Sequence, residues 1–431
     1  MYQRLRSLIR GERFWMVLAS LALRGQAFLV GLLITRLYGP EGLGLYAATL
    51  NVAASLVTPL TSLVQNNAAW LSARSSTAAA RRRLIEIHLP WLLAGGLLSL
   101  AGVLGLAQAS GLPLPWLPGG GWVLLAAASV IFYQLFNALG QGLLQGVGRF
   151  LGPAQASVAL TLILTVMSWP AIVYGGVHGA YLILAIGSIA LPCIALAIYL
   201  IGSERVDDRG VSGRPSETAL SVSLLLQRWR VSWPSVVAAL ISSAVTWLCL
   251  VYLVHRSHGS VGVGWVSLGV QWGTLMLLPV TSWGGLTMKR ILDSVGDRSG
   301  VGLRAVVARL VIQNGGVTLG LAALVVLASG ALGWLYRLPA GDLAAILMLT
   351  AVYAVLGSLN NVLERLYFCV HEQRAWMWLT SLGAVAQVLV TAMLIEHSYL
   401  AVAGGLAAGA LSTLLAAWLW FWRSPRGATP A

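Results

Sequence analysis

The chain has 431 residues, of which 58% are hydrophobic and only 9% are charged. Soluble domains carry roughly 25% charged residues, so this composition excludes a soluble globular protein and predicts an all-α integral membrane protein. The formal net charge of +14 raises the question of a nucleic-acid partner. The basic residues stand in short clusters between apolar runs and form no basic domain, which excludes that partner.

Twelve apolar runs are long enough to cross a bilayer, because about 20 helical residues span a hydrocarbon core of about 30 Å. We expect transmembrane helices over 14–37, 42–64, 89–109, 122–146, 154–174, 180–202, 234–254, 262–286, 306–328, 343–365, 376–396 and 400–422. Arg24 interrupts the first run and no small-residue cleavage pattern follows it, so we interpret this run as an uncleaved span.

The positions of the basic residues predict the orientation. Of the 27 Lys and Arg residues, 23 lie in connectors on one side of the membrane, and only Arg36, Arg256 and Arg337 lie in connectors on the other. Because connectors rich in Lys and Arg stay inside the cell, we expect a multi-pass membrane protein with both termini in the cytoplasm.

A repeated motif relates the two halves of the chain. The pattern R-x-x-G-x-x-G-x-G followed by P-x-T-S begins at Arg36 and again at Arg256, an offset of 220 residues. An even number of spans separates the copies, so the halves share one topology. We expect two pseudo-symmetric six-helix lobes, 1–203 and 232–431, joined by a polar cytoplasmic linker over 204–231.

Arg24 is the first candidate for binding a substrate. It lies ten residues into the first predicted span, about 15 Å deep at 1.5 Å per residue. A charge at the centre of a bilayer costs roughly 2.5–3.5 kcal/mol, so Arg24 should face protein or water. Its planar guanidinium suits phosphate oxygens, although a structural role toward a carbonyl or amide is the alternative.

Polar side chains at helical spacing form stripes on four of the predicted spans. The stripes predict a polar cavity that receives hydroxyl-rich sugars, although hydrogen bonds between helices would explain each residue taken singly. The candidate substrate-binding residues on these stripes are Asn51, Gln134, Asn137, Gln141, Gln271, Asn361 and Arg365.

The sequence offers little for catalysis, metal binding or proton coupling. No Asp or Glu lies deep in a predicted span, and Glu364 is near an inner edge. His255 and His258 have no third ligand nearby, and the three cysteines are separate. No nucleophile elbow or P-loop occurs, so we expect no cofactor, no metal and no enzymatic activity.

The segment T-R-L-Y-G-P-E-G-L-G-L-Y over 35–46, after a span that carries an arginine, resembles the first hairpin of bacterial polysaccharide (O-antigen type) flippases. These belong to the multidrug/oligosaccharidyl-lipid/polysaccharide exporter superfamily. The resemblance implies a V-shaped fold of twelve transmembrane helices and alternating-access translocation of an undecaprenyl-diphosphate-linked oligosaccharide. It also implies that Arg24 holds the diphosphate, that the lipid tail stays in the bilayer, and that glycan polymerase machinery is a partner.

Two alternatives stay open. A multidrug exporter of the same superfamily normally uses a membrane-embedded acid in its N-terminal half, and none is visible here. A membrane glycosyltransferase or polymerase for lipid-linked sugars generally needs a large outer loop with catalytic residues. The longest outer connectors, 110–121 and 329–342, carry only Arg337 and Asp342 as charges.

Overall fold

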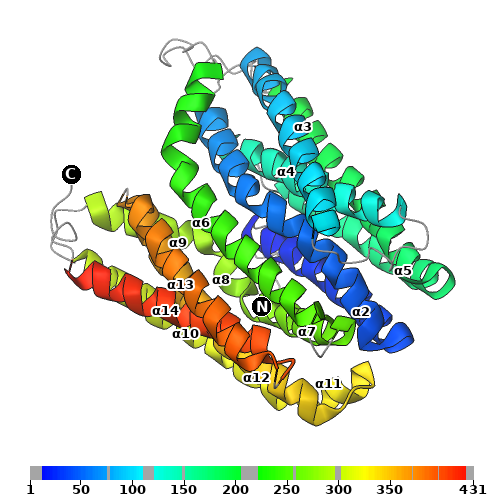
Figure 1. Ribbon diagram of the computed structural model, residues 1–431. Coiled ribbons are helices and arrows are strands. Elements are labelled where there is room, and N and C mark those ends of the chain that lie inside the picture. The colour runs from blue at the N-terminus through cyan, green and yellow to red at the C-terminus, as the bar shows by residue number, and fades with distance from the viewer. Residues whose placement is uncertain are drawn as a thin grey trace, which may run out of the picture. The chain divides into compact units, whose positions relative to one another are not determined.

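The computed structural model describes residues 12–74, 78–109, 121–147, 151–204, 222–255, 259–296, 302–370, 372–396 and 398–423 (Figure 1). All regular structure within these ranges is helical. The helices are α2 (Glu12–Arg74), α3 (Ala78–Ala109), α4 (Gly121–Val147), α5 (Leu151–Glu204), α6 (Val222–His255), α7 (Gly259–Met276), α8 (Leu278–Ser282), α9 (Gly284–Gly296), α10 (Leu303–Leu327), α11 (Ser329–Tyr336), α12 (Ala340–Cys369), α13 (Gln373–Leu394) and α14 (Ala401–Arg423).

Two of the helices change direction at a glycine. α2 contains Gly39 at φ 71° and α5 contains Gly176 at φ 60°, where the backbone leaves the helical region. Only glycine adopts positive φ without a steric penalty. Both positions fall between consecutive predicted spans, so each of these long helices contains two of them.

The predicted span over 262–286 is not one helix. The chain there forms α7, α8 and α9, with turns at Leu277 and Trp283. The predicted span is therefore divided into three successive helical segments, and backbone hydrogen bonds to the carbonyl four residues earlier persist at Leu277, Trp283 and Thr287. Pro279 lacks the N–H that a continuous helix needs, and Gly284 begins the next helix.

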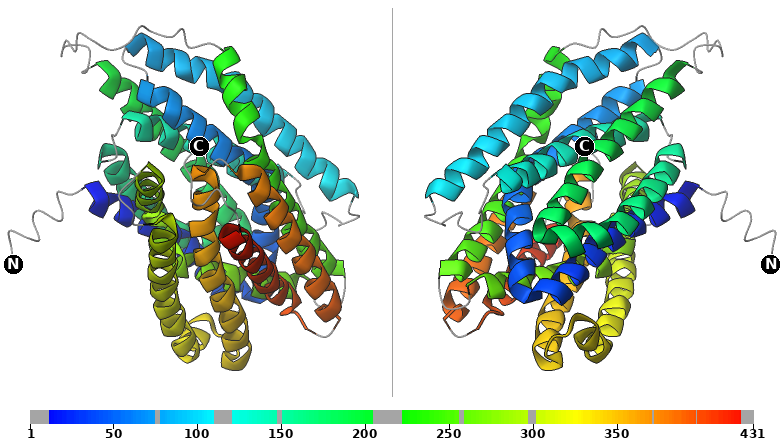
Figure 2. Two further views of the ribbon diagram at one scale, coloured as in Figure 1. Left: turned by 90° about the vertical axis from the view of Figure 1, so that its left-hand side faces the viewer. Right: turned by 90° about the vertical axis from the view of Figure 1, so that its right-hand side faces the viewer.

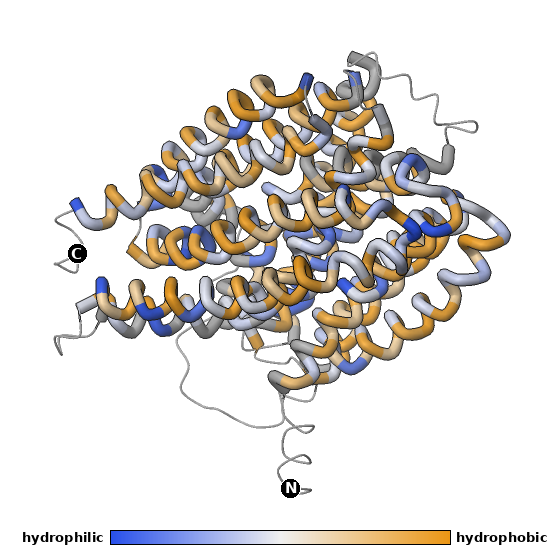
Figure 3. Tube along the Cα trace, turned by 90° about the horizontal axis from the view of Figure 1, so that it is seen from below, coloured by the Kyte–Doolittle hydropathy of each residue, from blue (hydrophilic) through white to orange (hydrophobic). Residues whose placement is uncertain are grey.

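The composition of the helices is that of a multi-pass membrane protein. Nine stretches of the described residues are long and apolar enough to cross a bilayer, the longest being Leu151–Ile201 with its break at Gly176. Apolar residues predominate along the helices (Figure 3). The count of twelve spans is compatible with these helices and stays a prediction.

By their internal contacts the helices group into two compact units. Unit 1 comprises Met1–Leu33 and Ala48–Leu240, and unit 2 comprises Ile34–Ala47 and Ile241–Ala431. Helices α2 and α6 therefore contribute to both units. The predicted lobe boundary at the polar linker stays a prediction, and most of that linker lies outside the described residues.

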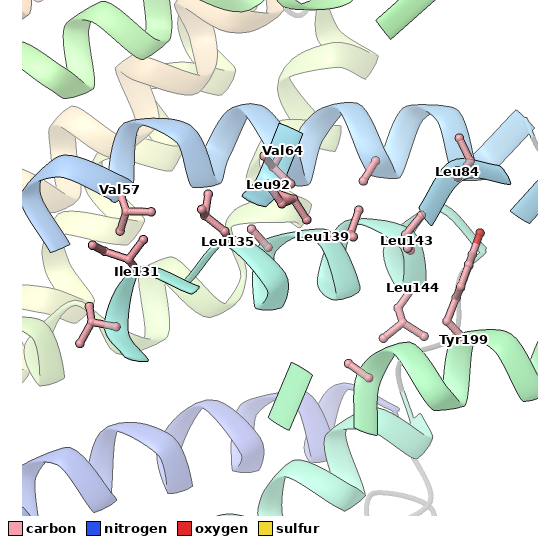
Figure 4. Packing of buried hydrophobic residues seen from close by; sticks show 14 of the residues in the cluster. Val57, Val64, Leu84, Leu92, Ile131, Leu135, Leu139, Leu143, Leu144 and Tyr199 are labelled. Carbon is pink, nitrogen blue, oxygen red and sulfur yellow. The ribbon is translucent and has the colours of Figure 1, made fainter. Parts of the chain in front are cut away.

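The core of unit 1 forms where α2, α3, α4 and α5 pack together (Figure 4). Leu135, Leu139 and Leu143 recur along one side of α4, as the helical period requires, and all are almost completely buried. At one end of this core the hydroxyl of Ser72 donates to the carbonyl oxygen of Leu143 at 2.8 Å. The same hydroxyl lies 3.3 Å from the phenolic hydroxyl of Tyr199.

In unit 2, α10 and α12 run side by side and are joined through α11 (Figure 2). The packing of α13 on α14 depends on glycines that allow close approach. A Cβ at Gly405 would overlap the hydroxyl of Thr391, and one at Gly409 would lie 2.8 Å from the carbonyl oxygen of Gly383. Small residues thus set the distance between these two helices.

The first part of α7 lies at the centre of unit 2, because residues 262–269 are all buried. The segment Ile34–Ala47 covers part of this stretch. A Cβ at Gly264 would overlap the carbonyl oxygen of Pro40 and lie 3.3 Å from the nitrogen of Gly44. Since Gly44 and Gly264 are equivalent positions of the repeat, the two copies of the motif pack against each other.

Candidate functional site

Arg24 lies in the first segment of α2, within the apolar stretch Leu18–Gly44. It is 12 residues after the start of α2 at Glu12 and 15 before the break at Gly39, or about 18 Å and 22 Å along the helix. Its side chain is half-buried. Arg24 therefore lies within the first apolar helical segment, and its depth in the bilayer stays a prediction.

The polar stripes of α2 and α4 meet in unit 1. The hydroxyl of Thr58 donates to Oε1 of Gln134 at 3.2 Å. Asn137 and Gln141 follow Gln134 by three and seven residues and so share its face of α4, and all three amides are half-buried. Asn51 lies on α2 two turns before Thr58; its side chain is outside the described part of the structure.

The amide face of α4 is distinct from its core face. Leu135, Leu139 and Leu143 fill the interior of unit 1, whereas the three amides keep part of their surface exposed. Among the described residues, only the Thr58 bond to Gln134 joins these amides to another helix. The face therefore offers donors and acceptors of the kind that bind the hydroxyl groups of a sugar.

Gln271 on α7 carries a polar atom without a protein partner. Its Oε1 is buried and accepts no hydrogen bond from any described residue. A buried acceptor left unpaired costs about 1–3 kcal/mol, so a bound molecule that donates to it would recover that energy. Gln271 is the repeat equivalent of Asn51, so both halves have an amide at this position.

The structure brings Asn361 and Arg365 together on α12. Nε of Arg365 donates to Oδ1 of Asn361, one turn earlier, at 2.8 Å, and both side chains are half-buried. The preceding residue, Asn360, has a different role, since its Nδ2 donates to the carbonyl oxygen of Ala410 on α14 at 2.9 Å. Asn361 thus orients Arg365, whereas the neighbouring Asn360 fastens α12 to α14.

Two contacts in this region could not be predicted from the spacing of polar residues. The guanidinium of Arg365 occupies the space that a Cβ at Gly284 would fill. Nε1 of Trp283, at the turn before α9, donates to Oδ1 of the buried Asn314 on α10 at 3.2 Å. The pair Gly284-Gly285 is the sequence signal that could have indicated a break there.

No group of three His, Cys, Asp or Glu side chains that could hold a metal ion occurs among the residues that the structure describes. Of the predicted H-x-x-H pair, His255 is exposed at the end of α6, and His258 lies outside the described residues. Cys249 and Cys369 are buried and Cys193 is exposed, and none forms a disulfide in the described part.

Known proteins resemble the chain in sequence and in structure. No model of a protein family matches it. It is 22% identical over 357 residues to the EPS I polysaccharide export inner membrane protein EpsE of Ralstonia nicotianae, covering 80% of this chain and 78% of that protein.

Solved transporter structures match nearly the whole chain. A MOP superfamily transporter from Pyrococcus furiosus, described as having a binding pocket of reverse polarity, matches with a TM-score of 0.65 and 18% identity over 96% of each chain. A MATE structure in complex with MaL6 matches with a TM-score of 0.63 and 17% identity, again over 96% of each chain. The chain therefore has the all-helical fold of the MATE transporters of the MOP superfamily.

Proposed function

We propose that this chain is a transporter of the inner membrane that moves a lipid-linked oligosaccharide from the inner to the outer leaflet by alternating access, with both termini in the cytoplasm. The supporting observation is the kind of polar group that its membrane-spanning helices carry. Arg24 lies near the middle of one such segment, and amides form a stripe along α4. An arginine suits a diphosphate and amides suit sugar hydroxyls, so the two sets match the two parts of the head group.

The comparisons support this choice of substrate. EpsE, which resembles the chain over most of its length, is described as a polysaccharide export protein. The fold is that of transporters. Two halves of like topology, which the sequence repeat predicts, are what alternating access requires. Undecaprenyl-diphosphate is the carrier that the flippase resemblance implies, and glycan polymerase machinery is the expected partner.

Multidrug export is the second candidate, because some of the structures that match the chain are multidrug resistance MATE transporters. A cationic substrate would favour acidic groups in its path. In unit 1 the described acid within an apolar stretch, Glu86, is exposed and paired with Arg83 at 3.1 Å. Within unit 1, this distribution of charge favours an anionic substrate, whereas in unit 2 the apolar stretch Ala340–Cys369 contains Glu364.

The test is export in a producing strain that lacks the native gene. Wild-type protein should restore surface polysaccharide, and Arg24→Ala should abolish export while the lipid-linked precursor accumulates inside. The Arg24→Lys variant should support weak export, because lysine keeps the positive charge but lacks the planar guanidinium that binds two phosphate oxygens at once. Arg36→Ala is the matched control, since Arg36 is exposed at the end of the same helical segment.

Full export by Arg24→Ala at a normal protein level would contradict the role of Arg24. A strain that resists cationic drugs through this protein, with no change in surface polysaccharide on deletion, would favour the multidrug alternative.

A further inference from the structure

Arg81, in the first turn of α3, is a charged side chain buried inside unit 1. Only 7% of its surface is exposed, and its Nε has no hydrogen-bond partner among the described residues. The next two residues, Arg82 and Arg83, are exposed, and Arg83 is paired with Glu86 at 3.1 Å. A guanidinium stays protonated in proteins, and burying it without an anion is strongly unfavourable. The position of Arg81 therefore favours a negatively charged neighbour.

The described groups around Arg81 do not supply a negative charge. No described carboxylate forms an ion pair with it. Its charge acts on the hydroxyl of Tyr199 on α5, which lies 3.3 Å from the hydroxyl of Ser72. Because the Ser72 hydroxyl donates to the carbonyl oxygen of Leu143, Tyr199 donates to Ser72 and keeps a lone pair for another donor. A phenol offers a dipole and no charge, so it stabilises Arg81 only in part.

The helix itself adds positive charge at this place. α3 has 32 residues, and the N–H groups of its first turn form the positive end of the helix dipole. This turn contains no acidic residue. Side chains of a helix lean toward its N-terminus, so the side chain of Arg81 is directed toward the positive end of α3. An anion bound beside both groups would stabilise them together.

The third predicted span of the second half has an arginine near its start with a different environment. Nη2 of Arg304 on α10 donates to the carbonyl oxygen of Trp422 at 3.3 Å, and its guanidinium lies 4.9 Å from the centre of the Trp422 ring. The C-terminal end of α14, where the helix dipole is negative, thus stabilises Arg304 within the protein. Among the described residues no helix end of this kind reaches Arg81, which favours a bound anion as its partner.

The place of Arg81 along α3 suits a group from the membrane surface. It lies near the start of the apolar stretch Ala79–Gly105, at the end that the basic residues predict to be cytoplasmic. Further along α3, Leu93 and Leu97 are exposed, so acyl chains can lie against the helix while a headgroup reaches its first turn. Anionic lipids attract basic residues at the cytoplasmic leaflet, and arginine suits phosphate oxygens.

We propose that Arg81, the hydroxyl of Tyr199 and the first turn of α3 bind a phosphate group, supplied by the headgroup of an anionic phospholipid. The lipid stabilises unit 1 and takes no part in transport as a substrate. Arg81 is not one of the candidate substrate-binding residues, and the site can be measured without transport. Failure of this site would therefore leave the proposed function as it stands.

The test uses delipidated full-length protein in maltoside micelles, which contain no phosphate, and measures the thermal unfolding midpoint as phosphatidylglycerol is added. The midpoint of wild type should rise with the lipid. Arg81→Gln should have an apparent affinity for the lipid about tenfold lower or worse, because it loses a charge-assisted hydrogen bond. Arg82→Gln is the matched control, since it removes the same charge from the adjacent, exposed residue and should respond as wild type does.

The micelles without phospholipid give a readout that a purely structural arginine would not give. There wild type carries a buried charge without an anion, so Arg81→Gln should unfold at the same or a higher temperature than wild type. The order should reverse when phosphatidylglycerol saturates the site. A lower midpoint for Arg81→Gln in both conditions, failure of Arg81→Gln to fold, or an equal rise in wild type and Arg81→Gln would overturn the site.

Inorganic phosphate at constant ionic strength distinguishes the source of the phosphate group. Phosphatidylglycerol should raise the midpoint of wild type, whereas inorganic phosphate in micelles without phospholipid should not. A rise with inorganic phosphate that Arg81→Gln abolishes, with no rise from phosphatidylglycerol, would overturn the assignment to lipid and identify a site for a free anion.

Discussion

Gly264 packs against the carbonyl oxygen of Pro40, and in this contact a motif that occurs twice in the sequence meets its own copy. A side chain at position 264 has no space, because the atoms it would meet belong to the backbone of 40 and 44 and cannot rotate away. The spacing of glycines in the repeat therefore reflects close packing between its two copies.

Gly264→Ala should destabilise the protein by about 1–3 kcal/mol, the usual cost of overpacking a core. Gly320→Ala, in α10, is the matched control, since a Cβ there meets nothing within 4 Å. This substitution should stabilise the protein by up to about 1 kcal/mol, because alanine favours a helix more than glycine does. Thermal unfolding of the purified variants measures both changes. Equal midpoints for the two variants would contradict the packing described here.

Neighbouring glycines of α14 provide a second comparison. Gly405→Ala should loosen α14 from α13, because its Cβ would overlap Thr391 and lie 2.8 Å from the carbonyl oxygen of Gln387. Gly404→Ala should be tolerated, since the nearest atom is a Leu394 methyl at 3.6 Å. We expect a loss of about 1–3 kcal/mol for the first and none for the second, measured by unfolding in detergent.

The adjacent amides of α12 should respond differently to truncation. Asn360→Ala removes the hydrogen bond to the Ala410 carbonyl and should lower stability by about 0.5–1.5 kcal/mol, the net worth of one hydrogen bond between α12 and α14. Asn361→Ala leaves that bond intact and releases Arg365, so it should weaken export at nearly unchanged stability. Complementation and thermal unfolding on the same two variants separate the effects. The reverse pattern would refute these assignments.

Tyr399, in the connector between α13 and α14, should ionise at a higher pH than a tyrosine in an unfolded chain. Burial raises the pKa of its hydroxyl to about 12, and the negative charge of Asp342, with which it forms a hydrogen bond, acts in the same direction. A tyrosine in an unfolded chain ionises near pH 10, so the contribution of this residue to stability is complete below about pH 10 and is lost as the pH rises toward 12.

Absorbance of phenolate measures this ionisation. Tyr399→Phe should remove one tyrosine from the part of the titration curve above pH 11 and leave the part near pH 10 unchanged. Asp342→Asn should shift that tyrosine to a lower pKa, because the negative charge is gone. If the titration curve of Tyr399→Phe differs from that of wild type only near pH 10, the pKa of Tyr399 is not raised and the prediction is contradicted.

Hydropathy predicts much of the fold, since the positions of most membrane-spanning helices follow from apolar length alone, and Gly39 and Gly176 mark two of the turns. It does not show that the chain over 262–286 is divided into α7, α8 and α9. Pro59 and Pro279 occupy equivalent positions of the same motif, yet α2 continues past Pro59 while the chain breaks around Pro279. A proline alone is therefore insufficient to divide the helix. The two repeats differ a few residues later, where Gly284-Gly285 stands in place of Val64-Gln65, and glycine disfavours a helix.

The candidate site was predictable in kind and only partly in detail. Helical spacing places Gln134, Asn137 and Gln141 on one face. It also allows the i, i+4 bond between Asn361 and Arg365. It could not show that Gly284 receives the guanidinium, since that contact joins residues 81 positions apart through tertiary packing.

Because Ile34–Ala47 belongs to unit 2, the two halves of the sequence cannot be separated cleanly. A fragment that starts after residue 221 would lack the cover of its own central helix and leave part of the apolar stretch 262–269 in contact with solvent or lipid. Such a fragment should aggregate when produced alone and be rescued by co-production of residues 1–204, so the second half of the chain depends on a segment that the first half supplies.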